Sequence, residues 1–235
     1  RAAKFRAETG ASGEEAQRFA EYVNAASGKS VLGLDKISDT ATKVRTDMGL
    51  MGDEMVAQSD RFLAYERASN QGAETVLAYD DILDAWNLTA ADTQKVMDTL
   101  IASHQAYGGA VTADQDALAK LAPVLRGANM DWQDAVALMN AGKASGLDAA
   151  EMVPALTKAL SQVESPEQLR DLIDQLAAIP DDGERAAKAM DLFGTRGGLK
   201  LAQALANGGL DAYRMSLDEV TGATKDASDA LDDTF

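Results

Sequence analysis

The sequence predicts an all-α protein, built as an array or bundle of short helical hairpins with no sheet. Two observations predict this class. Helix-opening patterns recur at a spacing of about 40 residues, and the apolar residues between them follow helical periodicity. A third observation excludes a sheet, because no window alternates apolar and polar residues around β-branched side chains as strands do.

Four segments share a turn residue, a capping position and an acid in the first helical turn. They are residues 10–15, 49–54, 87–92 and 129–134. Ser12, Thr89 and Asp131 are expected to accept hydrogen bonds from the free amides of these helix starts, and the acids that follow lie at the positive end of the helix dipole. A second opening is expected inside each interval, near Asp35, Ala73, Thr112 and Asp148. The pattern predicts a string of hairpins that repeats loosely.

Apolar stripes at helical spacing predict which helix faces form the core. The stripes are Val96, Met97, Leu100 and Ile101; Leu118, Leu121 and Leu125; Met152, Leu156, Leu160 and Val163; and Leu169, Leu172, Ile173 and Leu176. Ser165 and Pro166 are expected to open the last of these helices, and Pro180 to end it. Pro123 and Pro154 fall inside apolar helical runs, where each removes a backbone hydrogen bond, so bent or broken helices are expected there.

The composition predicts thin helix interfaces. Hydrophobic residues make up 46% of the chain but aromatic residues only 5%, so Ala, Leu, Val and Met carry most of the core. The chain begins at Arg1 and is expected to be either a single helical domain over 1–235 or a segment of a longer protein. A subdivision is also expected, with hairpins in 1–70, central hairpins in 71–163 and C-terminal helices in 164–235.

Charge and cysteine content exclude several classes of function. The formal net charge is −16, so the surface would repel a phosphate backbone, and direct nucleic-acid binding is not expected. The absence of cysteine excludes disulfides, thiolate metal sites and thiol catalysis, and is typical of a protein made in a reducing compartment. No apolar stretch approaches the roughly 20 residues that span a bilayer, so no membrane span is expected.

Titratable residues suggest no catalytic, cofactor or metal site. His104 is the only histidine, and it is expected to stabilise a helix end before Gly108 rather than act in catalysis. Asp80, Asp81 and Asp84 are interpreted as solvated surface, the alternative being a cation site completed by a second helix. Residues 181–184 have the acids of a calcium loop without its ligand spacing, and are predicted to be a turn and helix start.

The glycine-rich segment 194–200 contains a lysine, but its spacing differs from that of a phosphate-binding loop. It is predicted to be a hinge at residues 194–198, with Phe193 and Leu199 packed on either side. Trp86 and Trp132 are interpreted as helix openings that anchor one hairpin to the next, the alternative being binding to a partner protein. Together these features indicate that the segment is not an enzyme.

The amino-acid sequence of these segments resembles that of phage tail tape measure proteins along almost the whole chain. Weaker parts of the resemblance are residues 9–15, 48–54, 85–88 and 100–108. The more telling stretch runs from Leu118-Ala119-Lys120-Leu121-Ala122-Pro123 through Gly127-Ala128-Asn129-Met130-Asp131 and Ala141-Gly142-Lys143-Ala144-Ser145-Gly146-Leu147 to Leu156-Thr157-Lys158-Ala159-Leu160. The last part, residues 189–198, is similar to the Phe-Gly hinge that closes the central region of that family.

The resemblance implies a structural role in the virion. Such proteins are packaged inside the growing tail tube of long-tailed phages, set the tail length and leave the tube before the DNA at ejection. The implied partners are the tail tube protein, tail-assembly chaperones and distal tail or tip proteins, together with self-association. The implied location is the virion tail, after assembly in the host cytoplasm. The long coiled coil and the membrane-active segment of an entire family member are missing from these residues, which fits a fragment or a short relative.

One alternative to this role is a helical protein–protein interaction module, such as a tail-assembly adaptor that never enters the particle. A second is an enzyme, which would require two or more acids to gather on interior helix faces.

Overall fold

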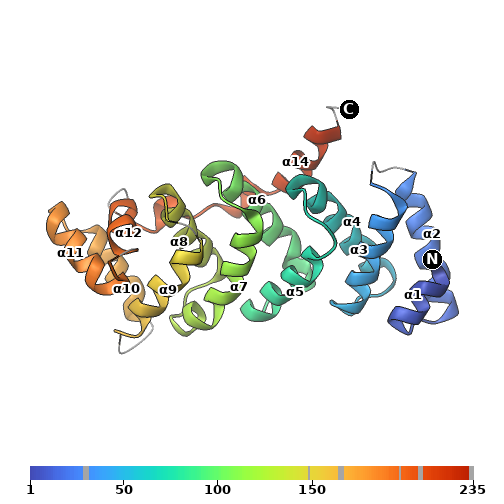
Figure 1. Ribbon diagram of the computed structural model, residues 1–235, viewed down its shortest axis with the longest axis horizontal. Coiled ribbons are helices and arrows are strands. Elements are labelled where there is room, and N and C mark those ends of the chain that lie inside the picture. Colours follow the sequence, from blue (N-terminus) through green and yellow to red (C-terminus); the bar gives the residue numbers. More distant parts are fainter. Residues whose placement is uncertain (29–31, 148, 164–166, 196, 206–208, 233–235) are drawn as a thin grey trace. The chain divides into compact units, whose positions relative to one another are not determined.

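The computed structural model describes residues 1–28, 32–147, 149–163, 167–195, 197–205 and 209–232. Within these ranges it contains fourteen α-helices, two short 3₁₀ helices and no strand, which confirms the all-α prediction (Figure 1). The α-helices are α1 Ala2–Thr9, α2 Gly13–Ser27, α3 Leu34–Thr46, α4 Gly52–Ser69, α5 Thr75–Trp86, α6 Thr93–Tyr107, α7 Val111–Gly127, α8 Trp132–Ala144, α9 Ala149–Leu160, α10 Glu167–Ala177, α11 Asp182–Phe193, α12 Gly198–Leu205, α13 Leu217–Val220 and α14 Ala223–Asp232. The 3₁₀ helices are η1 Ala90–Asp92 and η2 Asp211–Tyr213.

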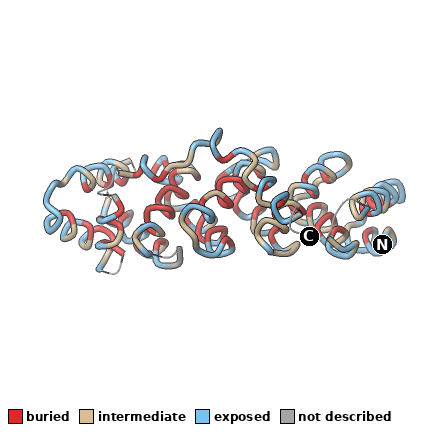
Figure 2. Tube along the Cα trace, turned by 90° about the horizontal axis from the view of Figure 1, so that it is seen from above, coloured by how far each residue is buried: buried red, intermediate tan, exposed pale blue. Residues whose placement is uncertain are grey.

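The helices belong to two compact units, each described separately below. Unit 1 comprises Arg1–Asp84, Leu88–Asp98 and Gly222–Phe235, and unit 2 comprises Ala85–Asn87 and Thr99–Thr221. In both units the helices bury one side and expose the other, as Figure 2 shows along the Cα trace. The three-part subdivision expected from the sequence stays a prediction.

Unit 1 has a core of aromatic side chains, which the low aromatic content did not predict. Phe5 on α1 stacks on Phe19 of α2, with ring centroids 3.9 Å apart and planes inclined by 10°. Tyr79 on α5 meets Phe62 and Tyr65 of α4 edge-on, at centroid distances of 5.8 and 5.0 Å. Such ring pairs stabilise a core beyond the area that they bury. Unit 1 also buries Ala16 and Ala41, so its helix interfaces combine alanine with these aromatic rings.

The C-terminal helix packs within unit 1. Helix α14 lies against α4, although more than 150 residues separate them in the sequence (Figure 1). Its first amides are bound by a buried acid of α6, because Asp98 Oδ2 accepts from the Gly222 amide at 2.9 Å and Oδ1 accepts from the Thr224 amide at 2.9 Å. Asp98 thereby caps a helix that lies far from it in the chain.

Unit 2 matches the composition-based prediction more closely. Its helices pack through small residues, among them the fully buried Ala135, Ala137 and Ala141 of α8. A Cβ atom on Gly142 would lie 2.6 Å from the sulfur of Met152, so glycine lets α9 pack closely on α8. Such thin interfaces allow short helices to stack at small separations.

Most of the predicted helix openings are confirmed. Ser12 and Asp131 form complete capping boxes with Glu15 and Asp134, respectively. Thr89 also pairs with an acid three residues on, but it opens the 3₁₀ helix η1 before α6 begins. The openings expected near Asp35, Ala73 and Thr112 correspond to the starts of α3, α5 and α7. Asp148, Ser165 and Pro166 lie outside the described residues.

The helices run continuously through both internal prolines. Pro123 lies inside α7 and Pro154 inside α9, so of the bent or broken helices expected there neither is broken, and a bend at each proline stays a prediction. Each lies on an exposed part of its helix, where water can solvate the carbonyl that loses its amide partner. Pro180 follows the end of α10 as predicted.

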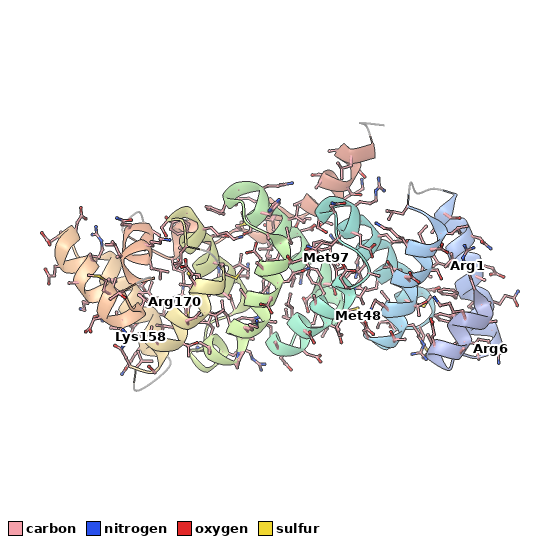
Figure 3. The ribbon with its side chains drawn as sticks, viewed as in Figure 1. Arg1, Arg6, Met48, Met97, Lys158 and Arg170 are labelled. Carbon is pink, nitrogen blue, oxygen red and sulfur yellow. The ribbon has the colours of Figure 1, made fainter. Side chains whose placement is uncertain are left out.

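The predicted apolar stripes are largely buried. Those of α6 and α7 are at most 1% exposed, including Met97, which Figure 3 labels on α6. Met152 and Leu156 of α9 are also fully buried, whereas Val163, which follows that helix, is half-buried. On α10, Leu169, Ile173 and Leu176 are fully buried and Leu172 is half-buried. The Leu160 side chain lies outside the described residues.

Candidate functional site

A buried polar network in unit 2 brings chemically capable side chains of several helices together. Lys143 of α8 forms an ion pair with Asp114 of α7, with Nζ and Oδ2 2.5 Å apart and side chains 6% and 1% exposed, respectively. The same ammonium donates to Ser103 Oγ of α6 at 3.1 Å. Ser103 in turn donates to Asn140 Oδ1 at 2.5 Å, and Asn140 Nδ2 donates to the Tyr213 carbonyl at 3.3 Å. The network joins α6, α7, α8 and η2.

This geometry favours a structural role over nucleophilic catalysis. A serine–lysine pair acts on a substrate only when the amine has a lone pair free to take the hydroxyl proton. The Lys143 ammonium is instead bound to Asp114, and Ser103 is fully buried with its hydroxyl directed at Asn140. Burial raises the pKa of Asp114 above its ordinary value, and the hydrogen bond from Lys143 opposes that rise. The network therefore holds three helices together.

A second polar cluster surrounds the start of α8. The buried Asp134 pairs with Arg214, and Arg170 of α10 (labelled in Figure 3) lies 3.4 Å from the same carboxylate. Arg214 also binds the capping residue Asp131, with 2.7 Å between Nη2 and Oδ2. Partial burial lowers the pKa of Arg214, but the carboxylates of Asp131, Asp134 and Asp211 together outweigh burial and raise that pKa. The capping box that opens α8 is thereby tied to α10 and to the segment after η2.

Unit 1 contains a buried acid, Glu66, whose carboxylate is only partly hydrogen-bonded. Glu66 of α4 is 2% exposed and accepts a 2.5 Å hydrogen bond from Thr40 of α3, while its Oε2 is buried without a hydrogen-bond partner. Burial raises the pKa of Glu66 to about 7, against the lowering effects of Thr40 and Lys36. It lines a cavity of about 460 Å³ together with Lys36 and Glu74. Mixed charge around this cavity indicates no single class of ligand.

A groove of about 920 Å³ in unit 1 lies between α2 and the start of α4, with Phe5 of α1 and Arg45 of α3 also in its lining. We call it the α2–α4 groove and define it by its two walls, which comprise lining residues between Ser12 and Ala25 and between Met51 and Val56, together with Phe5 and Arg45. Met51 is 51% exposed, and it is the one groove-lining residue among the four large apolar side chains that are exposed in the described part of the chain. The groove thus combines apolar surface with carboxylates.

His104 lies near the end of α6 as predicted. Its Nδ1 is 2.8 Å from the carbonyl oxygen of Gly109, so the ring bridges the helix end and the following turn. The imidazole is exposed, and its charge helps to lower the pKa of Asp114 in the buried network of unit 2.

The acids Asp80, Asp81 and Asp84 are exposed or half-buried on α5. Partial burial, reinforced by the charges of Asp84 and Asp47, raises the pKa of Asp80 to about 6. Among the described residues no group of three or more acids or histidines is placed to hold a metal ion. Asp181 caps α11 by accepting from the Glu184 amide at 2.7 Å, which confirms the predicted turn and helix start.

The glycine-rich segment differs from the prediction in one side chain. Phe193 is buried at the end of α11, but Leu199 is 44% exposed, so the expectation that both pack beside the turn is wrong. Gly198 begins α12, and a Cβ atom there would lie 2.3 Å from the Ala189 carbonyl oxygen. Leu199 is exposed because this close approach puts Gly198, the residue before it, against α11. Arg196 lies outside the described residues.

The two tryptophans are buried, in agreement with an anchoring role. Trp86 Nε1 donates to the Leu118 carbonyl of α7 at 2.9 Å, and both residues belong to unit 2. Trp86 is the last residue of α5 and not a helix opening, whereas Trp132 is the first residue of α8.

Sequence reasoning missed Asp114, Lys143, Asp98 and Glu66. A signal that could have found Lys143 was a polar residue inside an otherwise apolar helical stripe, as at Asn140 and Lys143 in α8.

No helix in the described part of the chain is long and apolar enough to cross a membrane. Comparisons with family models, with curated proteins and with solved structures found no match to this chain.

Proposed function

We propose that this chain is a segment of a phage tail tape measure protein, a structural protein that sets tail length inside the tail tube and leaves it at DNA ejection. One observation carries the proposal. The residues that resemble this family most specifically are the ones that hold the helices of unit 2 together.

Residues 141–147 illustrate this point. Gly142 provides the close approach to α9, Lys143 forms the buried ion pair with α7, and Gly146 adopts a φ of 75° that glycine tolerates best. Leu147 is 1% exposed. A motif whose members are used for helix packing, rather than for contact with a substrate, is expected of a structural family.

A second segment that resembles this family, residues 189–198, is also used for helix packing. The Ala189 backbone is the surface on which Gly198 packs, and the carbonyl of Asp191 accepts from Lys158 Nζ at 2.8 Å. Lys158, labelled in Figure 3, itself belongs to the resembling segment 156–160. Segments 156–160 and 189–198 therefore contribute to contacts between α9, α11 and α12.

The proposal is tested in a phage that carries this sequence. An in-frame deletion of helical sequence downstream of these residues should shorten the tail in proportion, by up to about 1.5 Å per deleted residue if that sequence is continuous helix. Tail length is measured by electron microscopy of purified particles. An unchanged length would exclude the ruler function.

The alternative is a helical interaction module or tail-assembly adaptor without catalytic activity. The α2–α4 groove, with its exposed Met51, favours this alternative because such surfaces serve to bind partners. Mass spectrometry of purified particles separates the two functions. A tape measure protein must be present in the particles, and an adaptor must be missing from them.

A further inference from the structure

We propose that the α2–α4 groove binds an amphipathic helix of a partner protein, with apolar residues on one face and lysine or arginine beside it. This inference concerns unit 1 alone and does not depend on the proposed tail function.

The shape of the groove matches a helix. Its α2 wall is formed by residues at helical spacing, from Glu14 through Arg18, Tyr22 and Ala25, over about three turns or roughly 16 Å. The opposite wall is the start of α4, from Met51 to Val56. A partner helix of similar length can lie between these walls, which is the common helix-in-groove mode of recognition.

The floor and walls of the groove supply the apolar contacts. Phe5 and Met55 line it and are buried at 2% and 4% exposure, so they form a packed base. Met51 at the rim remains 51% exposed, and Tyr22 and Val56 are half-buried. Methionine adapts its shape to different apolar surfaces, and an exposed methionine at a groove rim is suited to covering a partner's apolar face.

The charge of the groove selects the partner's polar residues. Four carboxylates line it, from Glu14, Glu15, Glu21 and Asp53, against the two arginines Arg18 and Arg45. Glu14 is neutralised by Arg18 at 2.9 Å, whereas Glu21 bonds only to the neutral Gln17 amide among the contacts described. Hydrogen bonds from Ser12 hold the pKa of Glu15 below its ordinary value, so Glu15 is charged at neutral pH. The net negative rim complements a cationic helix and repels a second copy of this acidic chain.

Arg45 restricts the direction in which a partner helix can lie in the groove. Its Nε is buried without a hydrogen-bond partner, and its Nη1 donates to the Gly49 carbonyl at 3.4 Å. The guanidinium is a cation in the groove lining, so the negative, C-terminal end of a partner helix dipole is favoured beside it. We therefore expect the C-terminal end of the partner helix to lie at Arg45.

The test uses the full 235-residue chain and three synthetic helical peptides of 18 residues. The first has leucine and methionine on one face and lysine on the flanks, the second replaces each lysine with glutamate, and the third scrambles the order of the first. Each peptide is labelled with fluorescein, and binding is measured by fluorescence anisotropy at low and high salt. The first peptide should bind saturably, and the other two should bind at least about tenfold more weakly.

Variants locate the site. Met51→Ser should weaken binding of the first peptide by about fivefold or more, because part of a methionine contact is lost. The matched control is Leu77→Ser on α5, since Leu77 is similarly exposed at 48% but lies outside the groove lining. The double variant Glu21→Lys with Asp53→Lys should weaken binding at low salt and much less at high salt. The control for that change is Asp81→Lys with Asp84→Lys on α5, which should leave affinity unchanged.

Three results would overturn the proposal. The first is equal binding of the scrambled or acidic peptide, and the second is an equal effect of Leu77→Ser and Met51→Ser. The third is a concentration-dependent dimer in sedimentation equilibrium that Met51→Ser dissociates, because the groove would then be occupied by a second copy. Circular dichroism of each variant shows that the fold is retained, so that a loss of binding is a loss of contacts.

Discussion

Asp98 on α6 caps the helix that begins beside Thr224, although the two residues are 126 positions apart in the sequence. The carboxylate accepts from the amides of Gly222 and Thr224 at 2.9 Å each and also from the Gln94 side chain at 2.9 Å. A carboxylate at a helix start satisfies amides that have no partner within the helix and interacts favourably with the dipole. Through this contact the end of the chain becomes part of unit 1.

Replacing this acid should loosen α14. Asp98→Ala removes two charge-assisted hydrogen bonds to buried backbone, so we expect the free energy of unfolding to fall by about 2–4 kcal/mol. Urea denaturation measures this loss, and hydrogen exchange at the Thr224 amide should become much faster. The control is Asp116→Ala on α7, an exposed acid paired with Lys120, which should cost less than about 1 kcal/mol. Unchanged exchange at Thr224 in Asp98→Ala would show that the cap does not hold the helix.

Glu66 should make unit 1 less stable as the pH rises. Its pKa is about 7 in the folded chain and 4.5 in the reference state, so the fold takes up a proton between these values. Below pH 4.5 the group is protonated in both states and has no effect, whereas above pH 7 the ionised, buried carboxylate destabilises the fold. Glu66→Gln should therefore raise the free energy of unfolding at pH 8 by up to about 3 kcal/mol.

The gain should disappear near pH 4.5, and the glutamine oxygen can still accept from Thr40. Denaturation is measured at pH 5, 6, 7 and 8, with Glu54→Gln as the control because Glu54 is an exposed acid on the same helix. A pH-independent effect of Glu66→Gln would contradict this account.

The buried pair Lys143–Asp114 should behave differently from surface pairs. Lys143→Met leaves the Asp114 carboxylate buried without its cation, and such a change costs about 3–5 kcal/mol. Adding Asp114→Asn should recover part of that loss, because the remaining group is neutral and can still hydrogen-bond. The matched surface change is Lys120→Met, whose partner Asp116 is 64% exposed, and it should cost less than about 1 kcal/mol. Equal losses from the two single changes would mean that burial adds nothing to the pair.

The parts of the fold that depend on neighbouring residues were predictable from the sequence. Ser12, Asp131 and Asp181 cap helices through bonds to residues three positions away, and these patterns are visible in any sequence. The stripe at Val96 and Met97 is local in the same sense, because helical periodicity alone places both on one face.

Contacts between distant residues were not predictable in this way. Asp98 and Lys143 look like ordinary surface charges in the sequence, and only the packing of α14, α6 and α7 gives them buried partners. The prediction for Leu199 was wrong in the opposite direction. This apolar residue next to a turn was expected to be buried, but it is exposed. The α2–α4 groove is lined by residues of four helices, α1 to α4, and has no signature in any one of them.

The last prediction separates a glycine needed for close packing from a glycine needed for flexibility. If residues 194–198 act as a hinge, alanine at Gly198 should cost little, since it only reduces the freedom of the unfolded chain. The structure predicts a larger effect, because the new Cβ would lie 2.3 Å from the Ala189 carbonyl oxygen and 2.6 Å from the Met190 Cα. Backbone atoms cannot move aside as a flexible side chain can, so α12 must shift away from α11. We expect Gly198→Ala to lower the free energy of unfolding by about 1–3 kcal/mol.

Gly127, the last residue of α7, provides the control, because a Cβ atom there meets nothing within 4 Å. Gly127→Ala should instead stabilise the chain by about 0.5–1 kcal/mol, since alanine loses less backbone entropy in a helix. Thermal and urea denaturation of both variants give the comparison. Stabilisation by both substitutions would mean that Gly198 serves as a flexible joint, whereas opposite signs would establish it as the contact that lets α11 and α12 pack.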